Sequence, residues 1–158
     1  MSKPNLKDNP GFLIRRLQQV SISLFLERLR QFGITPLQYT ILCIIEAQPG
    51  IDQISIASQA ALDTSTVKDI VARLEAKKLI ERRTGEHDRR SRAVSLDRAG
   101  SQLLVTIEPY IRRTQKELLA PLSESQQSML LRAIRTLLVA HEGAVSQTAK
   151  PWRRFRNL

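Results

Sequence analysis

The residues best suited to chemistry in this chain are polar side chains at the start of one predicted helix. They are Thr64, Ser65, Thr66 and Lys68, with Arg73 further along the same helix. Their hydroxyl, ammonium and guanidinium groups offer hydrogen bonds to a partner. No catalytic motif accompanies them, because the sequence has no nucleotide-binding glycine loop, no His-Glu-x-x-His and no Gly-x-Ser-x-Gly. They indicate binding, and we expect the chain not to be an enzyme.

A second polar group lies between two short segments of partly alternating polarity. The segments 79–84 and 92–96 predict a β-hairpin, and its connecting loop and second strand carry Arg89, Arg90 and Arg92. Cations at such a position suit an anionic partner. Asp88 would be repelled by such a partner, so we expect it to pair with Arg90 or with an arginine of 73–83. A freely solvated carboxylate is the alternative.

The chain as a whole is strongly basic. Its 158 residues include 25 Lys and Arg against 15 Asp and Glu, a net charge of +10. A polyanion is the usual partner of such a surface, although solubility alone is another explanation. One cysteine and two histidines exclude an internal disulfide and a cysteine-rich metal site. No segment resembles an export signal or a bilayer span, so we expect a cytoplasmic protein without membrane association and without a cofactor.

Two helices are expected in the first 45 residues. Leu13, Leu17, Val20 and Leu24 recur at helical spacing and predict an amphipathic helix over 11–32, which Gly33 ends. Thr35-Pro36-Leu37-Gln38 then combines an N-cap, a proline at the first helical position and a capping-box glutamine. The following run, 39–45, is apolar nearly all round, so this helix should be buried.

Two short helices separated by about three residues come next and predict a helix-turn-helix. Asp52 caps the first, in which Ile54, Ala57 and Ala61 share one face, and Asp63 caps the second. The second helix continues to Lys77 and should pack through an apolar stripe formed by Val67, Ile70, Val71 and Leu74. Its polar residues then face away from the core.

Two further amphipathic helices, over 98–119 and 126–140, dominate the C-terminal half. Pro109 removes one backbone hydrogen bond, and we expect a kink between Val105 and Pro109. These helices and the one over 11–32 are longer than a single small domain can cover. Their apolar stripes predict a two-fold homodimer, and a monomer with the three helices packed on one another is the alternative.

This order of elements resembles the MarR family of winged helix-turn-helix transcription regulators over about 12–140. The most specific stretch is 63–100, DTSTVKDIVARLEAKKLIERRTGEHDRRSRAVSLDRAG, in which Asp88 and Arg90 fill the Asp-x-Arg positions of the family's wing. Asp97 stands where threonine is usual, and both residues cap helices. Lys78 stands where glycine is usual, and a left-handed backbone there would strain a lysine.

The resemblance implies a mainly α fold with a small β-hairpin wing. It divides the single chain 1–158 into a winged helix-turn-helix lobe at 35–96, a helical dimerisation region formed by 11–33 and 98–142, and a basic tail at 143–158. It implies that the helix after Asp63 enters the major groove of double-stranded DNA while the wing arginines contact phosphate or the minor groove. Two lobes about 34 Å apart would then bind a pseudo-palindromic operator.

Many members of this family release DNA when a small, often anionic aromatic molecule binds between the dimer helices and the winged lobe. Here Arg15 or Arg16 could hold a carboxylate, and Tyr39 and Tyr110 could contact a ring. Solvent-facing arginines and ordinary core-edge tyrosines are the alternative. The resemblance thus predicts a ligand-responsive repressor of a catabolic, efflux or stress operon.

Two other functions stay open. Cys43 invites a redox-sensing regulator, although its apolar run has no neighbouring cation to stabilise a thiolate and favours a core position. A nonspecific architectural DNA-binding protein would share the basic charge but needs neither a wing nor dimer helices. In the tail, Trp152 and Phe155 alternate with arginines, and this segment either anchors on a partner subunit or adds a phosphate contact.

Overall fold

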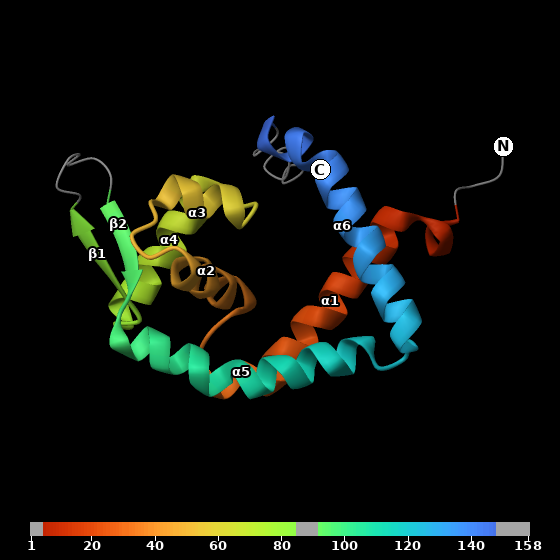
Figure 1. The fold of residues 1–158 in the computed structure, drawn as a ribbon, viewed down its shortest axis with the longest axis horizontal. Coiled ribbons are helices and arrows are strands. Elements are labelled where there is room, and N and C mark those ends of the chain that lie inside the picture. The colour runs from red at the N-terminus through yellow and green to blue at the C-terminus, as the bar shows by residue number, and fades with distance from the viewer. Residues whose placement is uncertain (1–4, 85–91, 148–158) are drawn as a thin grey trace.

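The computed structural model describes residues 5–84 and 92–147, and this part of the chain is mainly helical (Figure 1). In chain order the elements are η1 (Leu6–Asp8), α1 (Pro10–Leu29), η2 (Arg30–Phe32), α2 (Pro36–Ala47), α3 (Gln53–Gln59), α4 (Thr64–Ala76), β1 (Ile80–Thr84), β2 (Arg92–Leu96), α5 (Arg98–Leu119) and α6 (Glu124–Gln147). The predicted fold class, helices with one small β-hairpin, is confirmed.

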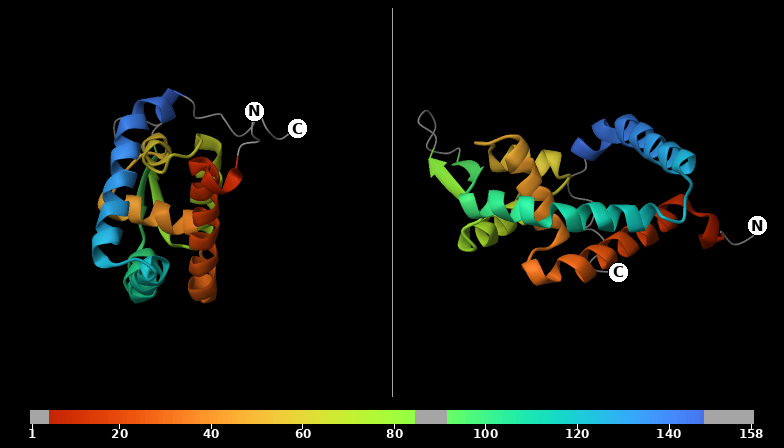
Figure 2. Two further views of the ribbon diagram at one scale, coloured as in Figure 1. Left: turned by 90° about the vertical axis from the view of Figure 1, so that its right-hand side faces the viewer. Right: turned by 60° about the horizontal axis from the view of Figure 1, so that its bottom comes forward.

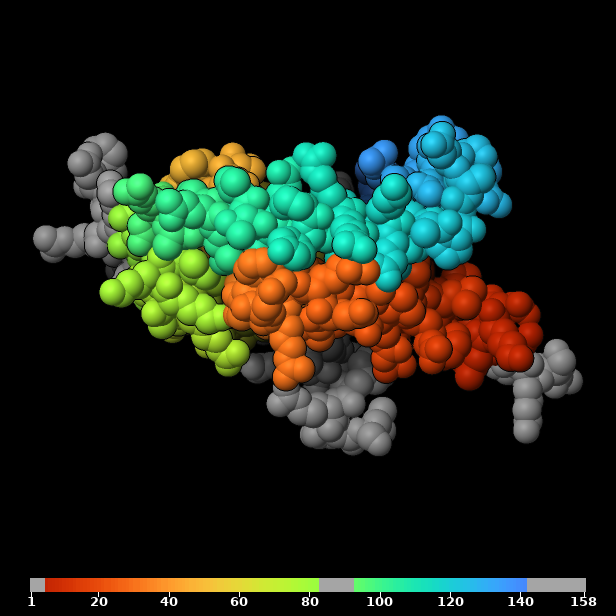
Figure 3. Space-filling model, turned by 90° about the horizontal axis from the view of Figure 1, so that it is seen from below, coloured from red at the N-terminus to blue at the C-terminus, as the bar shows by residue number. Residues whose placement is uncertain are grey.

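Helix α5 connects the two ends of the molecule. Helices α2, α3 and α4 and the hairpin form a lobe at one end of α5, and α6 turns back from its other end (Figure 1). The views of Figure 2 and the space-filling view of Figure 3 show α1 lying alongside α5. The lobe therefore packs at one end of a long pair of helices, α1 and α5.

Side-chain caps begin the helices of the lobe where the sequence places them. The Thr35 hydroxyl accepts the Gln38 N–H at 3.2 Å, and the Gln38 side chain accepts the Thr35 N–H at 3.1 Å. Asp52 accepts the Ile54 and Ser55 N–H groups at the start of α3. Asp97 caps α5 by accepting the Arg98 N–H. Each cap satisfies backbone donors that the first helical turn leaves without a partner.

The apolar stripe of α4 lies at the centre of the core. Its four residues are nine-tenths or more buried, and Val67, Val71 and Leu74 are completely inaccessible. They pack in one cluster with residues of neighbouring elements, among them Ile41, Leu42 and Ile45 of α2, Ile80 of β1, Val94 of β2 and Ile107 of α5. Removing any of these side chains would leave a cavity, so the rotation of α4 about its own axis is closely determined.

The strands of the predicted wing pair antiparallel, with Ile80 opposite Leu96 and Thr84 opposite Arg92. A third segment joins the hairpin, because Ile51 forms an isolated bridge with Val94. The Val94 N–H donates to the Ile51 carbonyl at 2.9 Å. The base of the wing is therefore tied to the turn before α3 and moves with the lobe.

Helix α3 packs differently from the prediction. Ile56 and Ala57 form its buried face, whereas Ile54 is 74% exposed. Ala61 lies beyond the helix with a φ of +51°, and the Leu62 N–H closes the turn on the Ala57 carbonyl. The prediction of one face shared by Ile54, Ala57 and Ala61 was wrong because α3 ends before Ala61, and its last turn leaves the helical path.

Helix α4 ends in the same kind of turn. Lys78 has a φ of +56°, and the Leu79 N–H donates to the Leu74 carbonyl at 3.0 Å. The backbone at Lys78 is therefore left-handed, and this is the position at which the family usually has glycine. The three long helices occur, with α6 continuing to Gln147, beyond the predicted end at 140. Helix α5 is continuous through Pro109, and the expected kink between Val105 and Pro109 stays a prediction.

Apolar side chains remain exposed on the helices outside the lobe. On α1, Leu13 is 49%, Leu17 44% and Val20 47% exposed, and on α6, Leu137 is 54% and Leu138 61% exposed. A single chain therefore leaves the stripes of α1 and α6 largely in water, contrary to the alternative of three helices covering one another. No helix among the described residues combines the length and apolar composition that a bilayer crossing requires.

Gly100, in the first turn of α5, allows α5 to pack closely against the turn between α4 and β1. A Cβ atom added there would lie 2.0 Å from the carbonyl oxygen of Leu79, which is backbone and cannot swing aside. That same carbonyl accepts the Asp97 N–H at 3.0 Å. The end of α4, the start of β1 and the start of α5 thus meet at one backbone contact.

We predict that Gly100→Ala destabilises the chain by at least about 2 kcal/mol, because the added methyl group must displace backbone. Gly11→Ala is the matched control, since the nearest atom to its added Cβ is the Asn9 side-chain oxygen at 3.4 Å. That control should be neutral or slightly stabilising, as alanine is favoured in helices. Chemical denaturation of both variants measures the difference, and equal stabilities would refute the close contact.

Candidate nucleic-acid interface

Helix α4 presents a polar face to solvent opposite its buried stripe. Thr64, Ser65, Lys68 and Arg73 are exposed, and Thr66 is half-buried. The structure therefore brings together on one surface the residues that the sequence singled out on this helix. Their contact with DNA stays a prediction.

The Asp63 carboxylate organises the first turn of α4. It accepts the Thr66 N–H at 2.9 Å and the Thr66 hydroxyl at 2.7 Å, and it also accepts the Ser65 hydroxyl. These hydrogen bonds, the one from Ser65 above all, lower the pKa of Asp63 below its ordinary value of 3.8. Because each hydroxyl proton is used inside the protein, Ser65 and Thr66 offer other partners only oxygen lone pairs.

Two charged contacts hold the other end of α4. The Lys77 ammonium donates to the backbone carbonyl of Gly33, in the turn before α2. Arg82 of β1 forms an ion pair with Glu75 of α4. Sequence reasoning missed both contacts, because a charge at 75 and an opposite charge at 82 lie on different elements and follow no helical or strand period.

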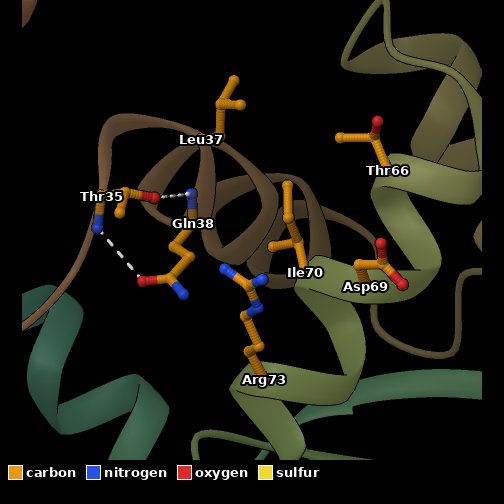
Figure 4. A pocket seen from close by; sticks show the side chains of 7 residues that line it. All are labelled: Thr35, Leu37, Gln38, Thr66, Asp69, Ile70 and Arg73. Carbon is orange, nitrogen blue, oxygen red and sulfur yellow. Dashed lines mark hydrogen bonds between the residues drawn. The ribbon is translucent and has the colours of Figure 1, made fainter.

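A hollow of about 250 Å³ lies between the start of α2 and α4 (Figure 4). Its lining residues are Thr35, Leu37, Gln38, Thr66, Asp69, Ile70 and Arg73. Figure 4 shows the Arg73 guanidinium directed toward Gln38, with the Asp69 carboxylate on the other side of Ile70. Arg73 therefore lies along the α2 edge of the exposed face.

The wing is described only at its base. Arg92 begins β2, and Asp88, Arg89 and Arg90 lie outside the described residues. The predicted pairing of Asp88 is therefore untested. Arg82, one of the arginines considered as its partner, pairs with Glu75.

The residues predicted for an effector site do not meet within one chain. Arg15 and Arg16 are exposed on α1, and Tyr39 packs against Phe25 with ring centroids 5.8 Å apart. Because Phe25 follows Arg16 by nine positions, the two lie about 14 Å apart along the helix axis. Tyr110 packs edge-on against a different ring, that of Phe32 at 5.1 Å. Arg16 and Tyr39 therefore do not touch each other directly, and their sharing of a ligand stays a prediction.

Cys43 has the environment of a core residue. It is half-buried on α2, and burial raises the pKa of its thiol, which opposes thiolate formation. Burial also raises the pKa of the neighbouring Tyr39 phenol, so that group stays protonated and can donate a hydrogen bond. Among the residues that the structure describes, no three His, Cys, Asp or Glu side chains gather closely enough to hold a metal ion.

Comparison with known proteins identifies this architecture. The sequence model of the MarR family matches residues 34–91. A transcriptional regulatory protein for the hcr operon of Thauera aromatica is 31% identical over 128 residues, which cover 80% of this chain and 77% of that protein. The chain belongs to the MarR family.

Two solved MarR-family structures show the same fold. The PcaV transcriptional regulator from Streptomyces coelicolor, in complex with its natural ligand, matches with a TM-score of 0.81 at 30% identity, over 89% of this chain and 99% of its own. A variant of MarR from Escherichia coli, in complex with operator DNA, matches with a TM-score of 0.80 at 23% identity, over 87% and 99%. The protein is thus a transcriptional regulator and not an enzyme, as the sequence predicts.

We predict that the stability of the protein falls with acidification partly through Asp63. Its pKa is lowered in the folded state, so its contribution is present above pH 3.8 and is lost as the pH falls from there toward the folded-state pKa. Asp63→Asn keeps a capping side chain but does not titrate, so its unfolding free energy should fall less between about pH 5 and pH 2.

Asp52→Asn is the companion variant, because hydrogen bonds from Ser55 lower the pKa of Asp52 as well. Its unfolding free energy should also fall less with acidification than that of the unmodified chain, and that of the double variant should fall least. Urea titrations across this pH range measure the effect, and identical profiles for Asp63→Asn and the unmodified chain would refute the role of the cap.

Proposed function

We propose that this MarR-family regulator is a ligand-responsive repressor that binds a pseudo-palindromic operator as a homodimer. The observation that carries the proposal is α4, whose apolar stripe is fully packed while its opposite face is polar and exposed. The major groove of B-DNA is about 12 Å wide and admits one α-helix. The E. coli relative with the same fold is bound to operator DNA, which supports this placement.

The cations of α4 suit the two walls of the groove. An α-helix turns by about 100° per residue, so Lys68 and Arg73 lie on opposite flanks of the exposed face. Each can approach a phosphate of a different strand. The wing arginines 89, 90 and 92 would extend the contact to phosphate or to the adjacent minor groove, and Asp88 would position them.

The exposed stripes of α1 and α6 favour a homodimer. Both belong to the proposed dimerisation region, 11–33 with 98–142, which lies outside the winged lobe at 35–96. A two-fold axis through this region would bury the apolar side chains of both copies at once. It would also set two α4 helices about 34 Å apart, one turn of DNA.

A second copy could also complete an effector site. Arg15 and Arg16 of one chain and Tyr39 and Tyr110 of the other would surround a cleft between the dimer helices and the lobe. Such a cleft suits a small aromatic acid, with arginine on the carboxylate and tyrosine on the ring. PcaV is solved with its natural ligand, which supports a ligand site in this architecture. The regulated genes would belong to a catabolic, efflux or stress operon, and the regulator would act in the cytoplasm.

We predict that the chain prefers an operator, selected from a random duplex library, over random DNA by about 10³-fold or more. Lys68→Ala and Arg73→Ala should each weaken binding to both DNAs by a similar factor, and each should reduce the slope of log affinity against log salt by about one. Arg112→Ala is the control, because that exposed α5 arginine pairs with Glu108 in its own helix. Fluorescence anisotropy across salt concentrations measures these effects.

Equal affinity for operator and random DNA would contradict a specific regulator and favour an architectural protein. If the slope of log affinity against log salt is unchanged in both Lys68→Ala and Arg73→Ala, α4 is not part of the DNA interface.

We predict further that an aromatic carboxylate lowers operator affinity, because it binds the DNA-free arrangement of the dimer more tightly. Arg16→Ala and Tyr39→Phe should blunt this release and leave DNA affinity without ligand unchanged, whereas Arg112→Ala should respond like the unmodified chain. Titration of operator complexes with a panel of aromatic acids measures it. If no acid acts and oxidant weakens binding in a manner lost in Cys43→Ser, the chain is a redox sensor.

A further inference from the structure

We propose that Asp69 is a specificity-determining residue that accepts a hydrogen bond from cytosine N4 in the major groove. The proposal rests on the DNA-binding function of α4 inferred above. The residue at the centre of the exposed face of α4 would then select which base lies opposite it.

The buried stripe of α4 decides which side chains face the floor of the groove. At about 100° per residue, the positions directly opposite the stripe are Ser65, Asp69, Ala72 and, at the end of the helix, Ala76, and all four are exposed. Lys68 and Arg73 lie on the flanks and point toward the walls. Asp69 is therefore the only charged residue at the centre of the face that α4 turns outward within the described chain.

Asp69 has no hydrogen bond or ion pair with any other residue that the structure describes. Figure 4 shows the Arg73 guanidinium directed away from it toward Gln38. A carboxylate placed between two phosphate backbones is repelled and loses hydration. That cost is offset when the carboxylate accepts a hydrogen bond from a base, and the donors in the major groove are the amino groups of cytosine and adenine.

Cytosine fits a carboxylate better than adenine does. Adenine presents the N7 acceptor beside its N6 amino donor, and N7 would repel the second carboxylate oxygen. The C5 position beside the cytosine amino group carries no lone pair. Asparagine, with one donor and one acceptor, matches the adenine edge instead.

The neighbours of Asp69 on the exposed face agree with this chemistry. Ser65, one turn earlier, donates its hydroxyl proton to Asp63 and therefore also offers DNA only lone pairs. Ala72 presents a methyl group, which suits the methyl of thymine. The centre of α4 thus carries acceptors and a methyl group, while its donors lie on the flanks.

The test is selection of binding sites from a random duplex library by the full chain and by Asp69→Asn, Asp69→Ala and Lys68→Ala. The unmodified chain should select cytosine at one position of each half-site, with roughly tenfold discrimination over the other bases. Asp69→Asn should move that preference to adenine, and Asp69→Ala should abolish it. Lys68→Ala should weaken binding and leave the selected sequence unchanged. Thermal unfolding of each variant establishes that the fold is retained.

Three results would overturn the proposal. If Asp69→Ala selects the same sequence as the unmodified chain, Asp69 contacts no base and the DNA-binding function stands. If Asp69→Ala binds all sequences more tightly with unchanged preferences, Asp69 acts only by repelling phosphate. If the unmodified chain enriches no sequence at all, the proposed regulator function fails together with the proposal.

Discussion

The burial of one apolar stripe on α4 is the constraint on which the rest of the molecule depends. Val67, Val71 and Leu74 have no contact with solvent, so the helix cannot rotate without opening cavities. The stripe thereby decides which polar residues face outward. The Asp63 cap fixes the start of the helix, and Lys77 and Glu75 fix its end against the turn at Gly33 and against β1. A helix held at both ends presents one defined surface to a partner.

The base of the lobe extends this rigidity to neighbouring elements. The bridge between Ile51 and Val94 ties the hairpin to the turn before α3, and the contact of Gly100 with Leu79 joins α5 to the end of α4. These contacts oppose internal rearrangement of the lobe. In the proposed dimer, a ligand would act by changing the separation of the two lobes across the long helices, where α1 and α6 leave apolar side chains exposed.

Much of this architecture could be predicted from the sequence because its signals are local. The capping box at Thr35, the Asp63 cap and the helical period of the α4 stripe each act within one turn or one helix. The close contact at Gly100 and the pairs Lys77–Gly33 and Glu75–Arg82 join separate elements, so spacing along the chain gave no sign of them. The packing face of α3 was predicted wrongly because the turn after α3 is left-handed at Ala61. Glycine usually marks such a turn in a sequence, and here the residue is alanine. The separation of Arg16 from Tyr39 likewise follows only from the packing of α1 against α2, where Phe25 contacts Tyr39.

In the proposed complex two copies of α4 occupy successive major grooves, and affinity cleavage tests this placement most directly. Ala76 is exposed at the last residue of α4, beyond the side chains proposed to contact bases, and Cys43 is the only cysteine of the chain, so Ala76→Cys in a Cys43→Ser background accepts a single iron chelate. On a selected operator, we predict two symmetric clusters of strand cleavage about one helical turn apart, each with the strand offset of a major-groove probe. A single cluster, a minor-groove offset or cleavage spread evenly along the duplex would contradict it.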